Sequence, residues 1–262
     1  MLGHTHALSG AAAWLALTST SVTALGWSQA TPVIALSGAV LAAGAALQPD
    51  LDTAQGTIAH SLPGVSRPLA QAVAAASGGH RHGTHGVIGI AAFTALAWAA
   101  CHAPTTTLWG RPVPAAAGIY AVILVALALK ALELVRGRVL GSTLGPWIVA
   151  LGTAGWLTWQ SSYHWPWLPQ VVALGALVHI LGDGLTVEGV PWLWPWNPAP
   201  PSGLRTIPGV GMVWQDNGYF RMPLLGETGS ARELGLAVLL GLYVAYQVLF
   251  EISTLLGVRW LR

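Results

Sequence analysis

Apolar stretches of about the length needed to cross a lipid bilayer dominate this chain of 262 residues. A spanning helix needs about 20 mostly apolar residues, with a range of roughly 17–25. Seven stretches come near this length: 7–26, 31–47, 86–104, 115–135, 143–160, 167–184 and 234–257. Only 8% of the residues are charged, against roughly 25% in a soluble domain. The sequence therefore predicts an all-α integral membrane protein, a polytopic bundle of about seven spanning or half-spanning helices.

Composition narrows the class further. A single cysteine, Cys101, excludes a disulfide scaffold. The net charge is only +2 and the basic residues are scattered, so no nucleic-acid partner is expected. Fourteen tryptophans suit a protein anchored at two membrane interfaces. The segments 7–26, rich in Ser and Thr, and 31–47, which is short, are the two that either span or enter the bilayer only part of the way.

Orientation follows from the arginines in alternate loops, because positive charge accumulates on the cytoplasmic side. With the N-terminus inside, the inner loops hold seven arginines and the outer segments three (Arg111, Arg259 and Arg262). The seven are Arg67, Arg81, Arg136, Arg138, Arg205, Arg221 and Arg232. We expect a multi-pass membrane protein with its N-terminus in the cytoplasm.

Two loops, at 48–85 and 185–233, are too long to be simple connections. Structureless loops of this length usually carry function. We therefore expect one membrane-embedded domain over residues 1–262 with two functional loops. The Trp192/Trp194/Trp196 run in the second loop is expected at the membrane interface, either as an aromatic belt or at the border of a lipid entrance.

Acidic and histidine side chains gather at one end of the predicted spans. In the topology above they all lie on the cytoplasmic side. The arginine count that set this topology did not include these residues, so their gathering is an independent observation. Ionisable groups at membrane depth are costly and are usually paired, coordinated or turned toward a cavity. The group consists of His6, Asp50, Asp52, His80, His85, His179 and Asp183.

The spacing of these residues suits a metal site. His179 and Asp183 stand at i, i+4 and share one helix face. Nitrogen and oxygen ligands without thiolate fit Zn²⁺, Mn²⁺ or Fe²⁺, and seven candidates are enough for two ions sharing a carboxylate. Each motif alone also has a structural explanation: a core histidine, carboxylates capping a turn, or a solvated loop.

The same motifs, in this order, resemble the YdjM family of bacterial inner-membrane metal-dependent hydrolases. The resemblance rests on Thr5-His6, Gln48-Pro49-Asp50-Leu51-Asp52, Gly79-His80-Arg81-His82-Gly83-Thr84-His85, His179-Ile180-Leu181-Gly182-Asp183 and Gly189-Val190-Pro191. It implies that His6, Asp50, Asp52, His80, His85, His179 and Asp183 hold one or two divalent metal ions, with Zn²⁺ expected and Mn²⁺ as the alternative. In motif order the family is more distantly similar to zinc-dependent phospholipase C and the S1/P1 nucleases.

This chain departs from the family pattern at three places. Thr53 stands where the family usually has a histidine, which removes one ligand. Gln48 replaces a common leucine, and His82 displaces a glycine while the i, i+5 spacing from His80 to His85 stays intact.

The leading hypothesis is a metal-dependent hydrolase that cleaves a phosphoester or pyrophosphate of a lipid or lipid-linked substrate. Asp52, Asp183 and Arg81 are the residues expected to take part directly in catalysis, with Arg81 as a phosphate contact. Arg221 is a weaker candidate for the same contact, and Glu233 is expected to pair with an arginine or to orient a ligand. Two alternatives stay open: a zinc-dependent lipid amidase resembling ceramidases, and a metal or ion transporter. Neither the lipid nor the oligomeric state follows from the sequence.

Overall fold

The structure is a computed structural model that describes residues 1–54, 56, 58–62, 64–135, 143–161, 165–207 and 209–258, apart from the side chain of Ser161. The fold is mostly helical with little strand, as the sequence predicts. Every segment predicted to span overlaps one principal helix. These helices are α1 (Gly3–Thr18), α2 (Pro32–Ala45), α4 (Val87–His102), α5 (Ala115–Ala131), α6 (Gly145–Ser161), α7 (Leu168–Gly184) and α10 (Ala231–Leu255).

The two long loops contain structure of their own, which corrects the expectation of structureless segments. Residues 48–85 include two 3₁₀ turns, η1 (Pro49–Asp52) and η2 (Gly83–His85), and the helix α3 (Ser66–Ser77). Residues 185–233 include the short helices α8 (Ser202–Arg205) and α9 (Val210–Val213).

Helix length separates the candidate spans into two groups. Within the described residues, two helical stretches are long and apolar enough to cross a membrane: Pro32–Asp52, which joins α2 to η1, and Ala231–Leu255. The apolar helices α4, α5 and α7 have 16 or 17 residues, or about 25 Å at a rise of 1.5 Å per residue. Seven full crossings therefore remain a prediction.

The first helix is shorter than the segment 7–26. It begins at Gly3 and ends at Thr18, because Ser19 adopts an extended conformation. The following residues fold back over the last turn, where the N–H groups of Leu25 and Ser28 donate to the carbonyls of Ala16 and Leu17. These bonds satisfy helix-end acceptors that would otherwise lack partners.

A β-hairpin corrects the all-α expectation. Strand β1 (Thr106–Leu108) pairs antiparallel with β2 (Arg111–Val113). The turn between them uses Trp109 and Gly110, both with positive φ (47° and 76°), as a two-residue hairpin turn of type I′ requires. β-Branched residues followed by Trp-Gly carried the signal, which the search for long apolar stretches overlooked.

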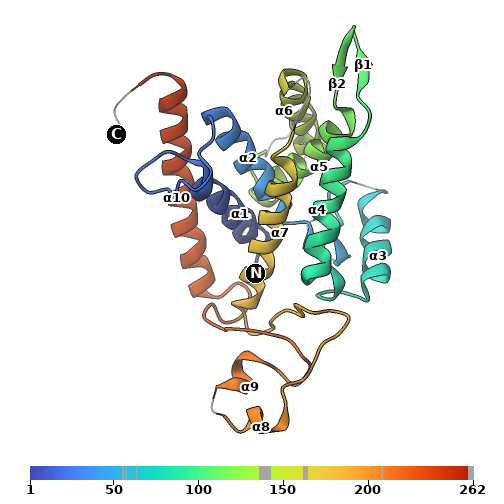
Figure 1. Cartoon of the computed structure of the whole chain (residues 1–262), viewed down its shortest axis with the longest axis vertical. Helices are drawn as coiled ribbons and strands as arrows, with labels where there is room; N and C mark the ends of the chain where they lie inside the picture. Colours follow the sequence, from blue (N-terminus) through green and yellow to red (C-terminus); the bar gives the residue numbers. More distant parts are fainter. Residues whose placement is uncertain are drawn as a thin grey trace.

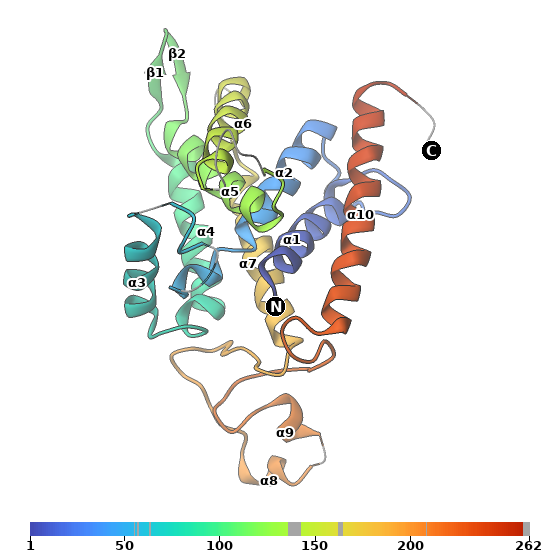
Figure 2. The ribbon, with the colours of Figure 1, turned by 180° about the vertical axis from the view of Figure 1, so that it is seen from behind.

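Successive principal helices run in alternating directions, so the bundle has two distinct ends (Figure 1). The site end is the end at which α1 begins and α7 finishes; the far end is the opposite one. The segment with α8 and α9 projects beyond the site end, whereas the β1–β2 hairpin projects at the far end (Figure 2). Helix α7 packs against α1, α2 and α4.

Small residues allow the central helices to approach closely. A Cβ atom on Gly44 would lie 1.9 Å from the carbonyl oxygen of Leu124 in α5, and one on Gly175 would lie 2.7 Å from Cβ of Ala45. Such contacts between small residues are how membrane helices pack without a hydrophobic driving force. They also fix the end of α2 against α7, where the acidic η1 turn begins.

Helix α10 carries a large exposed apolar surface. It packs chiefly on α1, and its outer face exposes Leu234, Val238, Leu242 and Leu249. Extended apolar patches of this kind mark contact with a membrane or a protein.

Candidate metal centre

All seven predicted ligands meet at the site end, although they come from widely separated parts of the chain. Helix α1 supplies His6, η1 supplies Asp50 and Asp52, the turn after α3 and η2 supply His80 and His85, and α7 supplies His179 and Asp183. The side chains of His6, His85, His179, Asp52 and Asp183 are buried, whereas Asp50 is partly and His80 largely accessible.

Four ligand atoms form a compact set at the centre of this group. His85 Nε2 and His179 Nε2 lie 3.2 Å apart, and each is 3.7 Å from Asp50 Oδ1 and 3.7 Å from Asp183 Oδ2. Ligand atoms about 2.1 Å from a tetrahedral Zn²⁺ are about 3.4 Å from one another. The five spacings that involve a histidine nitrogen are close to this value, so each carboxylate oxygen is placed to share an ion with the two histidines.

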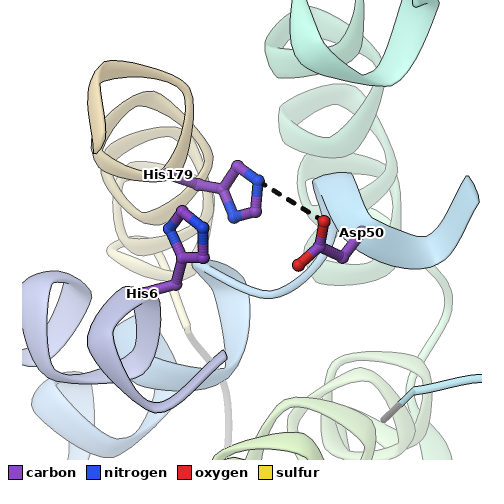
Figure 3. A group of neighbouring side chains, drawn as sticks. All are labelled: His6, Asp50 and His179. Atoms are coloured by element: carbon purple, nitrogen blue, oxygen red, sulfur yellow. Dashed lines mark ion pairs between the residues drawn. The ribbon is translucent and has the colours of Figure 1, made fainter. Parts of the chain in front are cut away.

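His6 lies beside this set and stacks on His179, with ring centroids 3.7 Å apart (Figure 3). Its ring is buried, and neither nitrogen makes a hydrogen bond of good geometry within the described residues, although Nε2 lies 3.2 Å from Asp183 Oδ1. Buried polar atoms are normally satisfied. A buried imidazole that faces a carboxylate without a hydrogen bond of good geometry is suited to bind a metal ion.

Backbone and side-chain contacts orient the imidazole rings. His179 Nδ1 lies 2.7 Å from the carbonyl oxygen of Ala46. A carbonyl can only accept, so Nδ1 carries the proton and Nε2 presents its lone pair to the centre. This is the usual support for a metal-binding histidine.

Asp52 stands behind the histidines rather than among the four atoms. Its Oδ1 lies 2.8 Å from His80 Nδ1, and its Oδ2 lies 3.3 Å from His85 Nδ1. It also accepts from the Thr84 hydroxyl at 2.5 Å and from the Arg81 N–H at 3.0 Å. In the described residues, three groups of His and Asp side chains have ligand atoms within 4.8 Å of one another, and Asp52 belongs to none of them. Its contacts suit a carboxylate that orients two histidines.

The carboxylates shape the electrostatics of the site. Burial disfavours the charged imidazolium of His85, but its hydrogen bonds to Asp50 and Asp52 outweigh this and raise the pKa of His85 to about 9. The field at this position therefore favours a cation.

Arg81 reaches into the centre from a strained backbone. Its φ of 57° is left-handed and unusual for a residue with a side chain. Asp52 holds its N–H, and the Tyr219 hydroxyl donates to its carbonyl at 3.1 Å. Its guanidinium lies 3.2 Å from Asp183 Oδ2 and 2.8 Å from Glu188 Oε2. Strain of this kind is maintained where it serves a function.

Glu233 anchors the start of α1. It is buried in the first turn of α10 and accepts from the N–H groups of Leu2 at 2.5 Å and Gly229 at 2.8 Å. It therefore binds backbone amides instead of the arginine partner that the sequence suggested. These bonds hold the turn that carries His6. The Met1 nitrogen lies 2.5 Å from Asp183 Oδ1 in the same region.

The second long loop, residues 185–233, packs against the turn that carries His80 and His85. Trp194 packs on that turn so closely that a Cβ on Gly83 would lie 2.9 Å from its ring. The N–H of Val87 donates to the carbonyl of Trp192 at 3.0 Å. Trp196 is exposed. Arg221 donates to the carbonyls of Val187 and Met212, so it ties the loop together rather than facing the site.

None of the other histidines in the described residues belongs to a group of possible metal ligands. His82 contacts the carbonyl of His80, and His102 stacks on Trp98. His60 is exposed, and His164 lies outside the described residues.

Sequence reasoning missed several residues around the site. Thr53, set aside because the family has histidine there, places its hydroxyl 2.6 Å from His80 Nδ1. Thr84 lies inside a quoted motif and Tyr219 in the second long loop, but only their contacts with Asp52 and Arg81 reveal what they do. Glu188 forms an ion pair with Arg81, but nothing in the sequence indicated this role beyond the small number of acidic residues.

Comparison with known proteins identifies the family of this chain. No curated protein and no solved structure matches the chain. The family described as YdjM inner membrane protein matches residues 1–254, which is nearly the whole sequence. This chain therefore belongs to the YdjM family of inner membrane proteins.

Proposed function

We propose that this protein is a membrane-bound, metal-dependent hydrolase that cleaves a phosphoester or pyrophosphate of a lipid or lipid-linked substrate. The observation that carries the proposal is the set of four atoms from His85, His179, Asp50 and Asp183, spaced 3.2–3.7 Å apart in the five pairs measured. Outside metal centres and catalytic sites, so many buried ionisable groups would be costly to hold together.

These residues would hold one divalent ion, for which Zn²⁺ is the first candidate and Mn²⁺ the second. When bound, such an ion polarises a phosphoryl oxygen and lowers the pKa of water toward about 7. A second ion would bind at His80, with the Asp50 carboxylate bridging the two ions, since the ligand atoms of Asp50, His80 and His85 also lie within 4.8 Å of one another. Asp52 keeps the lone pairs of His80 and His85 directed at the centre.

Arg81 supplies the phosphate contact. Its guanidinium is a planar fork that matches phosphate oxygens, and it already lies between two carboxylates. Glu188 is largely exposed, so a phosphate group can displace it without leaving a buried charge unpaired. Asp183 then holds the guanidinium at the edge of the centre.

Arg81 also favours a phosphoryl substrate over the amide of the ceramidase-like alternative, because an amide offers no anionic oxygens in its ground state. A transporter would need ionisable residues along a path through the bilayer. Here His179 and Asp183 occupy the last two turns of α7 and meet loops at the site end, which favours a reaction site near one interface. We place that interface, and the N-terminus, in the cytoplasm, with about seven helices crossing or entering the membrane.

Metal content of the detergent-purified protein tests the proposal. We expect one to two equivalents of Zn or Mn in the wild-type protein, with loss of metal in Asp183→Ala and in His85→Ala. The metal-loaded protein should then release phosphate or a phosphorylated head group from a phospholipid or a polyprenyl pyrophosphate, and leave a ceramide intact.

Two outcomes would contradict it. A wild-type protein that holds no stoichiometric metal, while both variants keep wild-type helix content, would overturn the metal centre. Release of fatty acid from ceramide without phosphoester cleavage would replace the phosphoesterase with the amidase.

A further inference from the structure

A second feature lies on the outer face of the bundle, away from the metal centre. A groove of about 830 Å³ opens between α1, α2, α4 and α7. Ligand pockets of roughly 300–1,000 Å³ are typical of sites for small molecules. The walls of this groove are apolar and include Trp14, Leu17, Ile34, Ala173, Leu174 and Leu177.

Helix α7 separates the groove from the metal centre. Gln170, Ala173, Leu174 and Leu177 follow the i, i+3, i+4, i+7 pattern of one helix face. His179 lies two residues beyond Leu177, which is about 200° further round the helix. Consistently, Leu177 is exposed whereas His179 is buried. A molecule in the groove is therefore on the other side of α7 from the metal ligands.

The polarity of the groove changes along its length. At the far end of the bundle, the apolar lining is replaced by the polar residues Ser28, Gln29, Thr31 and Gln170. These side chains offer hydroxyl and amide groups, and no lining residue in the described part of the chain is ionisable at neutral pH.

Tryptophans place the polar end at interface depth. Trp165 and Trp167 stack on each other just before α7, and Trp27 is exposed in the loop beside Ser28. Tryptophan gathers at the level of the lipid head groups and ester linkages. The groove therefore runs from that level into the hydrocarbon layer.

We propose that this groove binds an acyl chain of an ester-linked membrane lipid from the leaflet opposite the metal centre. The chain lies against the apolar wall, and its ester carbonyl accepts hydrogen bonds from Ser28, Gln29 or Thr31. The absence of charge among the described rim residues suits the uncharged ester better than the phosphate. The site goes beyond the proposed hydrolase and does not depend on it.

Photolabelling in nanodiscs tests this site. The probe is a phosphatidylethanolamine with a diazirine midway along one acyl chain, diluted in unlabelled phosphatidylethanolamine, and labelled peptides are mapped by mass spectrometry. We expect labels to concentrate on the groove faces of α1 and α7. Ala173→Trp and Leu177→Trp, which fill the groove from two positions, should reduce this labelling to the level found on α6. Leu151→Trp, on the exposed face of α6, is the matched control and should leave it unchanged.

Several results would overturn the proposal. One is labelling spread evenly over α6, α10 and the groove in the wild-type protein. Another is wild-type labelling in both groove variants. A change of oligomeric state in those variants would show instead that a helix of a second copy occupies the groove. Loss of groove labelling on chelation would show that the two sites are one, whereas unchanged labelling supports their separation whatever the outcome for the hydrolase.

Discussion

The two faces of α7 lie against different surroundings although they belong to one helix of 17 residues. Toward the site end, its inner face carries His179 and Asp183 among histidine and aspartate partners from four other segments. Along its outer face, Ala173, Leu174 and Leu177 border an apolar groove that ends in uncharged polar groups. The comparison shows that α7 carries its ionisable groups on the face where other charges or a cation can compensate for them, and none on its groove face, as the cost of burial requires.

The same contrast exists along α10. Glu233 and Glu251 are both buried. Glu233, at the site end, accepts two backbone N–H groups, whereas Oε1 of Glu251, near the far end, has no hydrogen-bond partner among the described residues. One carboxylate therefore has a structural task connected to His6, and the other provides a control in the same helix.

The largest effect is expected from Asp183→Ala. The substitution removes one of the four central atoms and a contact of His6, so metal should fall from stoichiometric to background in the purified protein, as measured by mass spectrometry. Gln170→Ala, on the groove face of the same helix, should retain full metal. Equal metal in both variants would remove the distinction between the two faces of α7.

Arg81→Lys should come next. Lysine keeps the positive charge but lacks the planar fork, so we expect phosphoester hydrolysis to fall roughly 100-fold, the scale for losing one donor to a developing charge. Metal content should stay at the wild-type level. Wild-type turnover in the lysine variant would mean that Arg81 serves only to neutralise Asp183 and Glu188.

Glu233→Gln should weaken metal binding without abolishing it. Loss of the carboxylate charge loosens the turn that carries His6, and supporting contacts of this kind contribute roughly 10–100-fold to metal affinity. Titration with Zn²⁺ against a competing chelator measures the change. Glu251→Gln should bind like the wild-type protein, and a similar loss in both variants would point to general destabilisation of α10.

Gly38→Ala should have the smallest effect on the site and act on the groove wall alone. A Cβ atom at this position would lie 2.1 Å from the Trp14 indole nitrogen, so Trp14 has to move. Overpacking of this kind costs roughly 1–3 kcal/mol, which a thermal melt in detergent would detect. Zinc affinity should not change; a parallel loss of affinity would show that the two regions are coupled.

Much of the candidate site was predictable because its residues are rare in this chain. With four aspartates and nine histidines among 262 residues, those at the ends of predicted spans stand out, and the alternation of spans brings them to one side. The motif order then identifies the family, which the match over residues 1–254 confirms. The ligand roles of these residues stay a prediction until metal is measured.

Local contacts that end helices and orient individual side chains could not be predicted from the sequence. The end of α1 at Thr18 depends on the backbone bonds of the returning 19–31 segment. The β1–β2 hairpin depends on a short turn signal that a search for long apolar stretches ignores. That Asp50 contributes to the four-atom set while Asp52, two residues later, stands behind two histidines depends on the 3₁₀ turn at Pro49–Asp52, which turns the two carboxylates apart.

Composition and motif order are enough to identify this protein as a mostly helical member of an inner-membrane family with acids and histidines near the ends of its apolar segments. The composition alone favours a membrane protein, because apolar helices with so few charged residues are poorly soluble in water. Three features follow from the three-dimensional packing alone: which atoms meet at 3.2–3.7 Å, the hold of Glu233 in the last helix on the start of the first, and the separation of a buried polar centre from a groove by α7. Those outcomes depend on close helix packing at glycines such as Gly44 and Gly175, and contacts between distant segments leave no periodicity for a single sequence to reveal.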